Sequence, residues 1–221
     1  MTAPTLALLA ALLAPTAPTA ALPTLYAGYM EVVGTKDVPV IGTLKTRNRT
    51  WFLAERTPTE DGGFALRQRI CQVEFDRVMG VQVKLGPALL EHLPAVEARL
   101  DPLPGGFFGG RWAQGWDATD VDRDGKPGGT IVVDAPMCGG RLYVQSQTVT
   151  KAKARPVEGA IDGRIAVSVD QKILGADSAC LKAASEDEHL EQTGWFRLVP
   201  VPADATCLAW RRADWPAAPG R

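Results

Sequence analysis

The sequence predicts an all-β fold with minor helix, built as a single antiparallel β-barrel. Short runs of β-branched and aromatic residues recur along the chain and are separated by Gly, Pro, Asp and Asn, which is typical of an all-β domain. About ten such strands joined in sequential hairpins favour a barrel, because closure removes exposed strand edges. A two-sheet β-sandwich satisfies the same pattern and stays open as the alternative.

The strand-like segments follow one another with turn residues between them. The clearest connection is 57–63, whose Pro, Asp and Gly residues predict a hairpin. Within the next segment the apolar positions change from even to odd numbers near Ile70, which predicts a β-bulge there. The predicted strands are 26–33, 38–46, 50–56, 64–75, 81–85, 96–100, 130–133, 141–150, 163–169 and 195–201.

Helix is expected at two places at most. Residues 87–93 begin with a proline, which the first helical turn tolerates, and end just before Pro94. Residues 181–190 combine alanines with acidic residues and fit either a second short helix or a solvated loop, with the loop favoured.

The N-terminus has the pattern of a secretory signal. Residues 6–14 are an unbroken run of Leu and Ala, and small residues lead from there to Ala21. We therefore expect a signal peptide over 1–21 and a single β domain over 22–221, secreted or periplasmic/extracellular. The run is shorter than the roughly 20 residues of a membrane-spanning helix. A disordered leader on a cytosolic protein is the alternative, because no Lys or Arg precedes the run.

Four cysteines are spread along the chain without Cys-x-x-Cys spacing: Cys71, Cys138, Cys180 and Cys207. In an exported protein they predict two disulfides, and three pairings are open. We favour Cys71 with Cys138 and Cys180 with Cys207, because the last two flank one strand-like segment. Buried free thiols are the alternative if the protein is not exported.

Three aspartates at alternate positions, Asp120, Asp122 and Asp124, stand before Gly125 and predict a calcium site. Calcium binds six to eight oxygens, and a D-x-D-x-D-G loop supplies them while glycine permits the turn. Asp117 and the backbone carbonyl of Lys126 are further candidate ligands. The twelfth loop position lacks the bidentate Glu of an EF-hand, so affinity should be weak and the role structural. A metal-free Asp/Gly turn is the alternative.

The loop and the segments around it carry the resemblances of this chain to known proteins. The run from residue 120 to 133 resembles the calcium loops of FG-GAP-type repeats, in a single copy. The wider pattern, with 140–145, 171–176 and 195–199, resembles uncharacterised secreted bacterial proteins and implies no activity. The early Ala27-Gly28-Tyr29 followed by a β meander is similar to the opening of lipocalin-like barrels.

Charge and the scarce histidines restrict the function. The formal net charge is −1 and no basic stripe is present, so nucleic acid is not an expected partner. The sequence has no Gly-x-Ser-x-Gly motif whose serine could act with His92 or His189, which argues against a hydrolytic triad.

The aromatic residues of 107–116 either plug one end of the barrel or form an exposed lip, and the plug is favoured.

We therefore expect an exported, non-enzymatic β-barrel that binds a small ligand or an envelope surface and carries a structural calcium loop. Two alternatives remain. One is a secreted hydrolase that uses carboxylates near the Asp loop, with Asp117 or Asp134 as candidates. The other is a structural or interaction module of the envelope, which would expose a large apolar patch.

Overall fold

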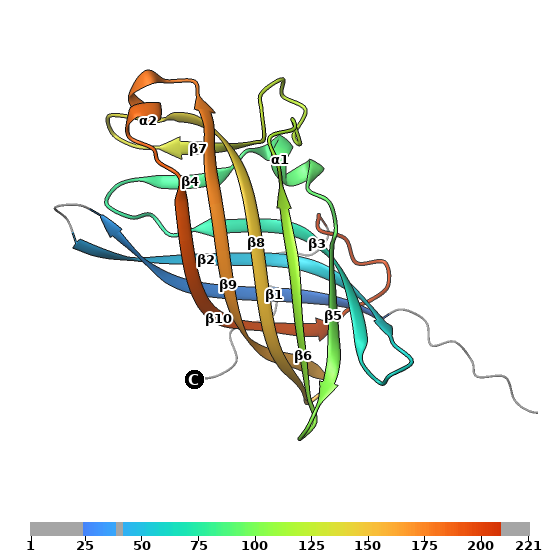
Figure 1. The fold of residues 1–221 in the computed structure, drawn as a ribbon. Helices are drawn as coiled ribbons and strands as arrows, with labels where there is room; N and C mark the ends of the chain where they lie inside the picture. Colours follow the sequence, from blue (N-terminus) through green and yellow to red (C-terminus); the bar gives the residue numbers. More distant parts are fainter. Residues whose placement is uncertain (1–23, 39–41, 209–221) are drawn as a thin grey trace, which may run out of the picture.

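The computed structural model describes residues 24–38 and 42–208. The expected signal peptide, 1–21, lies outside these residues. Ten strands and two short helices lie within them (Figure 1). The strands are β1 (Thr24–Val38), β2 (Gly42–Pro58), β3 (Phe64–Phe75), β4 (Gln82–Leu85), β5 (Val96–Leu103), β6 (Phe107–Trp116), β7 (Gly129–Asp134), β8 (Gly140–Val157), β9 (Ala160–Ala176) and β10 (Glu188–Pro200), and the helices are α1 (Pro87–His92) and α2 (Ala179–Ala183).

Eight of the strands close into a hydrogen-bonded ring. The order around it is β8-β6-β5-β3-β2-β1-β10-β9, and β9 pairs with β8 again. Every pairing is antiparallel. The ring confirms the predicted antiparallel barrel, and its closure distinguishes the fold from a sandwich of two separate sheets.

The two remaining strands extend the upper end of the barrel. β6 pairs with residues 146–154 of β8, whereas β7 pairs with residues 140–144 of the same strand. β4 then pairs with β7. In Figure 1 these short strands lie across the top of the molecule, close to α1 and α2. They therefore form an upper wall that the eight-stranded ring alone would lack.

A hydrophobic core fills the lower part of the barrel. Alternate residues of a strand point to opposite faces, so every second side chain enters the interior. Phe64, Leu100 and Leu198 are among the largest side chains that are fully buried. Phe108 and Trp112 of β6 pack against this core. The favoured interior position of these two aromatic residues is thereby confirmed.

Most of the predicted elements are present, but several of them differ in their bounds or in type. Residues 42–46 of the predicted strand 38–46 belong to β2 together with all of 50–56, whereas Val38 is the last residue of β1. β8 and β9 are longer at both ends than predicted, and β10 begins at Glu188 rather than at residue 195. β6 was not predicted as a strand. In the segment 181–190, a short helix ends at Ala183 and β10 begins at Glu188, so a loop joins a helix and a strand there.

The predicted β-bulge lies at Cys71. Trp51 faces Gln72 and Phe52 faces Ile70, so Cys71 is the extra residue of β3. A bulge accounts for the change in the inward-facing positions that the sequence shows near Ile70. It also turns the Cys71 side chain to a position where it can be bonded from outside the sheet.

The favoured disulfide pairing was wrong. Cys71 is bonded to Cys207, and Cys138 is bonded to Cys180. The reason is that the segment after β10 runs back along the barrel to β3, while α2 lies beside the turn between β7 and β8. Proximity in the sequence is a poor guide in a barrel, because strands far apart in the chain are neighbours in space.

Within the described ranges, no helix has the length and apolar character needed to cross a bilayer.

Candidate ligand cavity and candidate metal loop

The inward-facing side chains change from buried to half-buried towards the upper end of the barrel. On β9, Ile165 and Val167 are 5% and 6% exposed, whereas Val169 and Ile173, which face the same way, are half-buried. On β10 the same change falls between Gln192, which is buried, and Leu190, which is half-buried and lies nearer the upper end. Apolar residues that face inward but are not fully covered indicate that the upper interior is incompletely filled.

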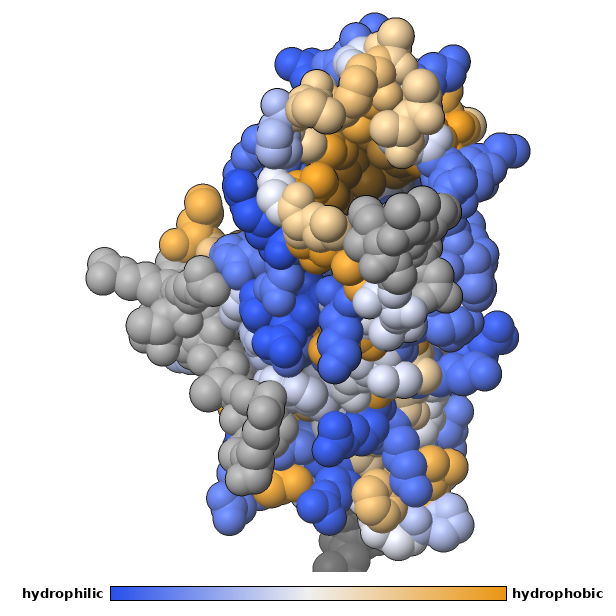
Figure 2. Space-filling model, turned by 90° about the vertical axis from the view of Figure 1, so that its left-hand side faces the viewer, coloured by the Kyte–Doolittle hydropathy of each residue, from blue (hydrophilic) through white to orange (hydrophobic). Residues whose placement is uncertain are grey.

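Figure 2 shows the resulting hollow directly. A deep apolar recess opens on this side of the molecule, at the height of α2, β7 and β4 in Figure 1. By strand register, the half-buried apolar side chains that face the upper interior come from seven strands. They are Leu44, Val73, Phe75, Val83, Leu85, Val133, Leu142, Val169, Ile173 and Leu190.

The lower interior has no comparable space. A small cavity of about 20 Å³ lies there among the described residues, lined by core side chains that include Phe52, Leu100 and Phe196. That volume holds about one water molecule. The cavity described in the lower interior is therefore too small for a ligand larger than water.

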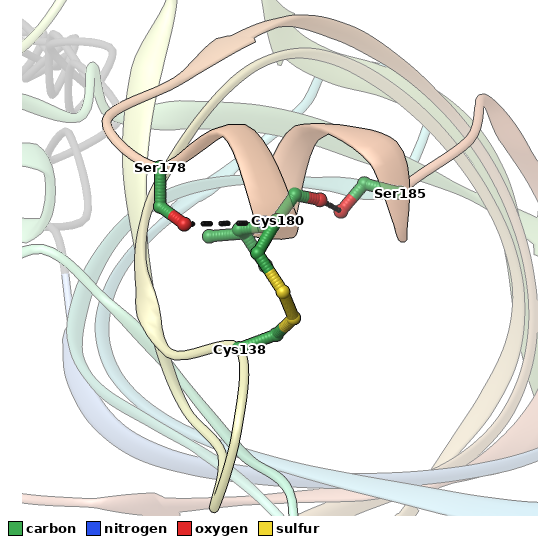
Figure 3. Close-up of a disulfide and its surroundings, with 5 residues drawn as sticks. Cys138, Ser178, Cys180 and Ser185 are labelled. Carbon is green, nitrogen blue, oxygen red and sulfur yellow. Dashed lines mark hydrogen bonds between the residues drawn. A yellow bond between two sulfur atoms is a disulfide. The ribbon is translucent and has the colours of Figure 1, made fainter.

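Helix α2 forms a roof at the upper end (Figure 3). The Cys138–Cys180 disulfide ties it to the turn between β7 and β8. The Ser178 hydroxyl accepts a hydrogen bond from the Leu181 amide at 3.2 Å, and the Ser185 hydroxyl donates one to the Leu181 carbonyl at 2.8 Å. The Leu181 side chain is 4% exposed and so packs against the barrel. Capping and disulfide together hold a helix that is too short to be stable alone.

A polar group lies where the packed core meets the hollow. Gln192 is 3% exposed and faces inward from β10. Its carboxamide oxygen accepts a hydrogen bond from Asn48 Nδ2 at 3.1 Å, and its nitrogen donates to the Thr46 hydroxyl at 3.5 Å. Asn48 and Thr46 are on β2, which is separated from β10 by β1. We call Gln192, Asn48 and Thr46 the polar floor.

Gly34 of β1 makes this arrangement possible. It pairs with both Thr46 and Gln192, so it lies directly between the two strands. A Cβ atom at this position would lie 2.8 Å from Gln192 Cγ. The missing side chain therefore lets Gln192 cross β1 and reach β2.

The Asp loop follows β6 and leads into β7. Carboxylate oxygens of Asp120, Asp122 and Asp124 lie within 4.8 Å of one another. Asp120 accepts hydrogen bonds from the amides of Asp124 and Gly125 at 3.1 and 2.9 Å. Asp124 accepts from the Thr130 hydroxyl at 2.7 Å. The three predicted ligands are thus brought together by bonds within the loop.

Asp122 is the residue that most favours a cation. Its side chain is 2% exposed, and its Oδ2 accepts from the Thr130 amide at 2.7 Å. Its Oδ1 is buried and has no hydrogen-bond partner in the described structure. A buried carboxylate oxygen without a partner is costly, and a bound cation would remove that cost. The donor set of hard oxygens fits calcium.

Electrostatics keep Asp120 ionised. Partial desolvation raises the pKa of Asp120. Hydrogen bonds from the backbone amides of Gly125, Asp124 and Arg123 lower it by a larger amount together, so the pKa lies below its ordinary value. The other two candidate ligands are placed differently. The Asp117 carboxylate accepts bonds from the amide and hydroxyl of Thr119. The Lys126 backbone carbonyl stays a prediction, and the ammonium of this residue lies 5.9 Å from the centre of the Tyr143 ring.

The two candidate carboxylates of the hydrolase alternative, Asp117 and Asp134, are each bonded to a neighbouring side chain. Asp134 pairs with Arg77 at 3.3 Å, and Asp117 is engaged by Thr119. Another acidic group lies on the outer face of β9 and β10, where His189 contacts Asp170 at 2.6 Å and Glu191 at 3.2 Å. The hydrogen bond from Asp170 raises the pKa of His189 above its ordinary value. All three side chains are solvent-exposed.

The polar floor and the hollow were missed by sequence reasoning. The signal in β10 is the alternation of Leu190, Gln192, Gly194 and Phe196, which places a glutamine at an inward position. A second signal is Gly34 in the middle of a strand, because strand glycines mark close approaches. Neither identifies the partner across the barrel.

Comparison with known proteins adds one remote structural likeness. No protein-family model matches the chain. No curated protein is significantly similar to it. The structure of DynF, from the dynemicin biosynthesis pathway of Micromonospora chersina, superposes with a TM-score of 0.46 at 13% sequence identity, and the match covers 87% of this chain and 89% of DynF. A likeness of this size carries no functional argument.

Proposed function

We propose that this protein is an exported, non-enzymatic carrier that holds a small apolar molecule in the upper hollow of its barrel. The observation that carries the proposal is the ring of inward-facing apolar side chains that stay half-buried. Filling such a space with an apolar molecule removes their surface from water, at about 25 cal/mol for each Å² buried.

The architecture supports a carrier in two further respects. The lower half of the barrel is packed, so it provides a rigid base for a preformed site. The roof helix α2 is held by a disulfide, so the upper end keeps its shape without a ligand. Preformed sites bind with a smaller ordering cost than sites that must fold around a ligand.

Calcium has a structural role in this proposal. Asp120, Asp122 and Asp124 hold the ion through side-chain oxygens, and its charge satisfies Asp122 Oδ1. Because Asp122 and Asp124 both bond Thr130, the ion fixes the start of β7, which is part of the upper wall. The affinity is in the millimolar range, as for extracellular calcium modules.

Export is proposed on two grounds that support each other. The apolar run 6–14 has the pattern of a signal peptide, followed by one β domain over 22–221. Two disulfides, Cys71–Cys207 and Cys138–Cys180, are usual in oxidising compartments and rare in the cytosol.

The test is a titration with N-phenyl-1-naphthylamine, a neutral probe that fluoresces in apolar surroundings. We expect saturable binding of one probe per chain. Leu190→Trp adds bulk inside the hollow and should weaken binding at least tenfold. Thr193→Trp places the same side chain on the exposed outer face of β10 and should leave binding unchanged. Absence of saturable binding, or equal binding by both variants, would refute the proposal.

A further inference from the structure

Three hydrogen-bonding side chains at the polar floor point to the chemical class of the ligand. We infer that the ligand is amphipathic and neutral, with a hydroxyl, carbonyl or amide group that bonds to Gln192 and Asn48 while its apolar body fills the hollow. This inference rests on the proposed carrier function and adds a requirement for one polar group at one end.

The first argument is position. Gln192 is 3% exposed, while Leu190, the next inward-facing residue of β10 towards the upper end, is half-buried. On β2 the same boundary lies between Thr50, which is 9% exposed, and half-buried Asn48. The polar floor therefore lies at the inner end of the hollow. The walls above it are mostly apolar, and by strand register Thr148, Gln171 and Glu188 also face this interior.

The second argument is hydrogen-bonding capacity. A carboxamide has two N–H donors and two acceptor lone pairs. The bond between Asn48 and Gln192 uses one donor of Asn48 and one lone pair of Gln192, and the bond to Thr46 uses one donor of Gln192. Among the described residues, one further N–H of Gln192 and one of Asn48 have no acceptor, and the Gln192 oxygen keeps a second lone pair. The pair can thus donate to and accept from the same ligand group.

The third argument is charge. The polar floor consists of two carboxamides and one hydroxyl, so it brings no charge to balance an ionised ligand. A carboxylate there would lose its hydration without gaining an ion pair, which costs more than burial of a neutral group. A purely apolar molecule would avoid that cost but would leave the free carboxamide groups without new partners.

The experiment compares three molecules that share one ring system: naphthalene, 2-naphthol and 2-naphthoate. Equilibrium dialysis of the full chain at pH 7 gives a Kd for each. We expect 2-naphthol to bind about fivefold to tenfold more tightly than naphthalene, which is the effect of one or two net hydrogen bonds. 2-Naphthoate should bind more weakly than 2-naphthol.

The double variant Gln192→Leu/Asn48→Leu removes both carboxamides, so that neither is left unsatisfied. It should bind naphthalene at least as tightly as the wild type does and lose the preference for 2-naphthol. Thr46→Val, which keeps the shape of the side chain, is a second variant for the case that the double variant does not fold, and it should reduce the preference. Gln147→Leu, at an exposed position of β8, is the matched control and should retain it.

The outcomes separate the inference from the proposed function. Equal binding of naphthalene and 2-naphthol, or strongest binding of 2-naphthoate, would overturn the inference and leave the carrier function standing. A preference for 2-naphthol that survives in the double variant would also overturn it. Binding of none of the three would overturn both.

Discussion

Asn48 and Gln192 are 144 positions apart in the sequence, and their carboxamides form a hydrogen bond of 3.1 Å inside the barrel. The two residues belong to strands that are not neighbours, because β1 lies between β2 and β10. The bond exists because β1 has a glycine, Gly34, at the point where Gln192 crosses it. β2 and β10 are thereby linked through side chains across β1, with which both also pair through the backbone.

Gly34→Ala should therefore disturb this link. The new Cβ would lie 2.8 Å from Gln192 Cγ and 2.9 Å from the Glu191 carbonyl oxygen. Such crowding in a packed interior costs about 1–3 kcal/mol. We expect the free energy of unfolding, measured by urea denaturation, to fall by that amount. Thr193→Ala, at an exposed position of β10, should change it by less than about 0.5 kcal/mol. Equal stability of wild type and Gly34→Ala would show that the contact is not close.

The calcium role predicts that stability depends on the ion. At a concentration ten times its Kd, calcium should raise the free energy of unfolding by about 1.4 kcal/mol, and a chelator should reverse this. Asp122→Asn removes the buried charge, so it should abolish the calcium response without lowering the stability of the calcium-free protein. Glu60→Gln, on an exposed turn, should keep the response. If neither calcium nor chelator changed the melting temperature of the wild type, the calcium site would be refuted.

The two disulfides should differ in their effect on the ligand. Removal of either by paired Cys→Ser substitution should lower stability by about 2–5 kcal/mol. Only loss of Cys138–Cys180 frees the roof helix α2, so only that variant should release bound probe faster in stopped-flow measurements. Loss of Cys71–Cys207, which is bonded at the bulge of β3, should leave the release rate unchanged. Equal release rates in the two variants would mean that α2 does not cover the hollow.

The contact between His189 and Asp170 predicts the direction in which the stability of the protein changes with pH. The hydrogen bond from Asp170 raises the pKa of His189 above its ordinary value of about 6.5. A group whose folded-state pKa is raised stabilises the fold below its unfolded pKa, and this contribution is lost as the pH rises through the folded pKa.

NMR titration of the His189 ring should therefore show a midpoint above about 6.5. Asp170→Asn should lower the midpoint, and the stability advantage of wild type over this variant should shrink as the pH rises from 6 to 8. Glu97→Gln, on β5, is the matched control. A midpoint that does not move in Asp170→Asn would show that the contact is absent in solution.

The sequence predicted the barrel because strand alternation and turn residues are local properties. It missed β6 because glycines and aromatic residues such as Gly109 and Phe108 obscure the alternation. It predicted the three aspartates of the loop because their ligand spacing is also local. The disulfide pairing, the hollow and the polar floor depend on strands that meet only when the ring closes. No local pattern specifies which side chains will face each other across it.

The most direct test of the central claim is a methyl NMR titration with N-phenyl-1-naphthylamine. Chemical-shift changes should gather on methyl groups that line the hollow, such as those of Val83, Val133 and Leu190. The methyl groups of Leu100 and Leu198, which are fully buried in the lower core, should not move. Changes confined to outward-facing methyl groups, or spread evenly over the molecule, would contradict binding in the upper hollow of the barrel.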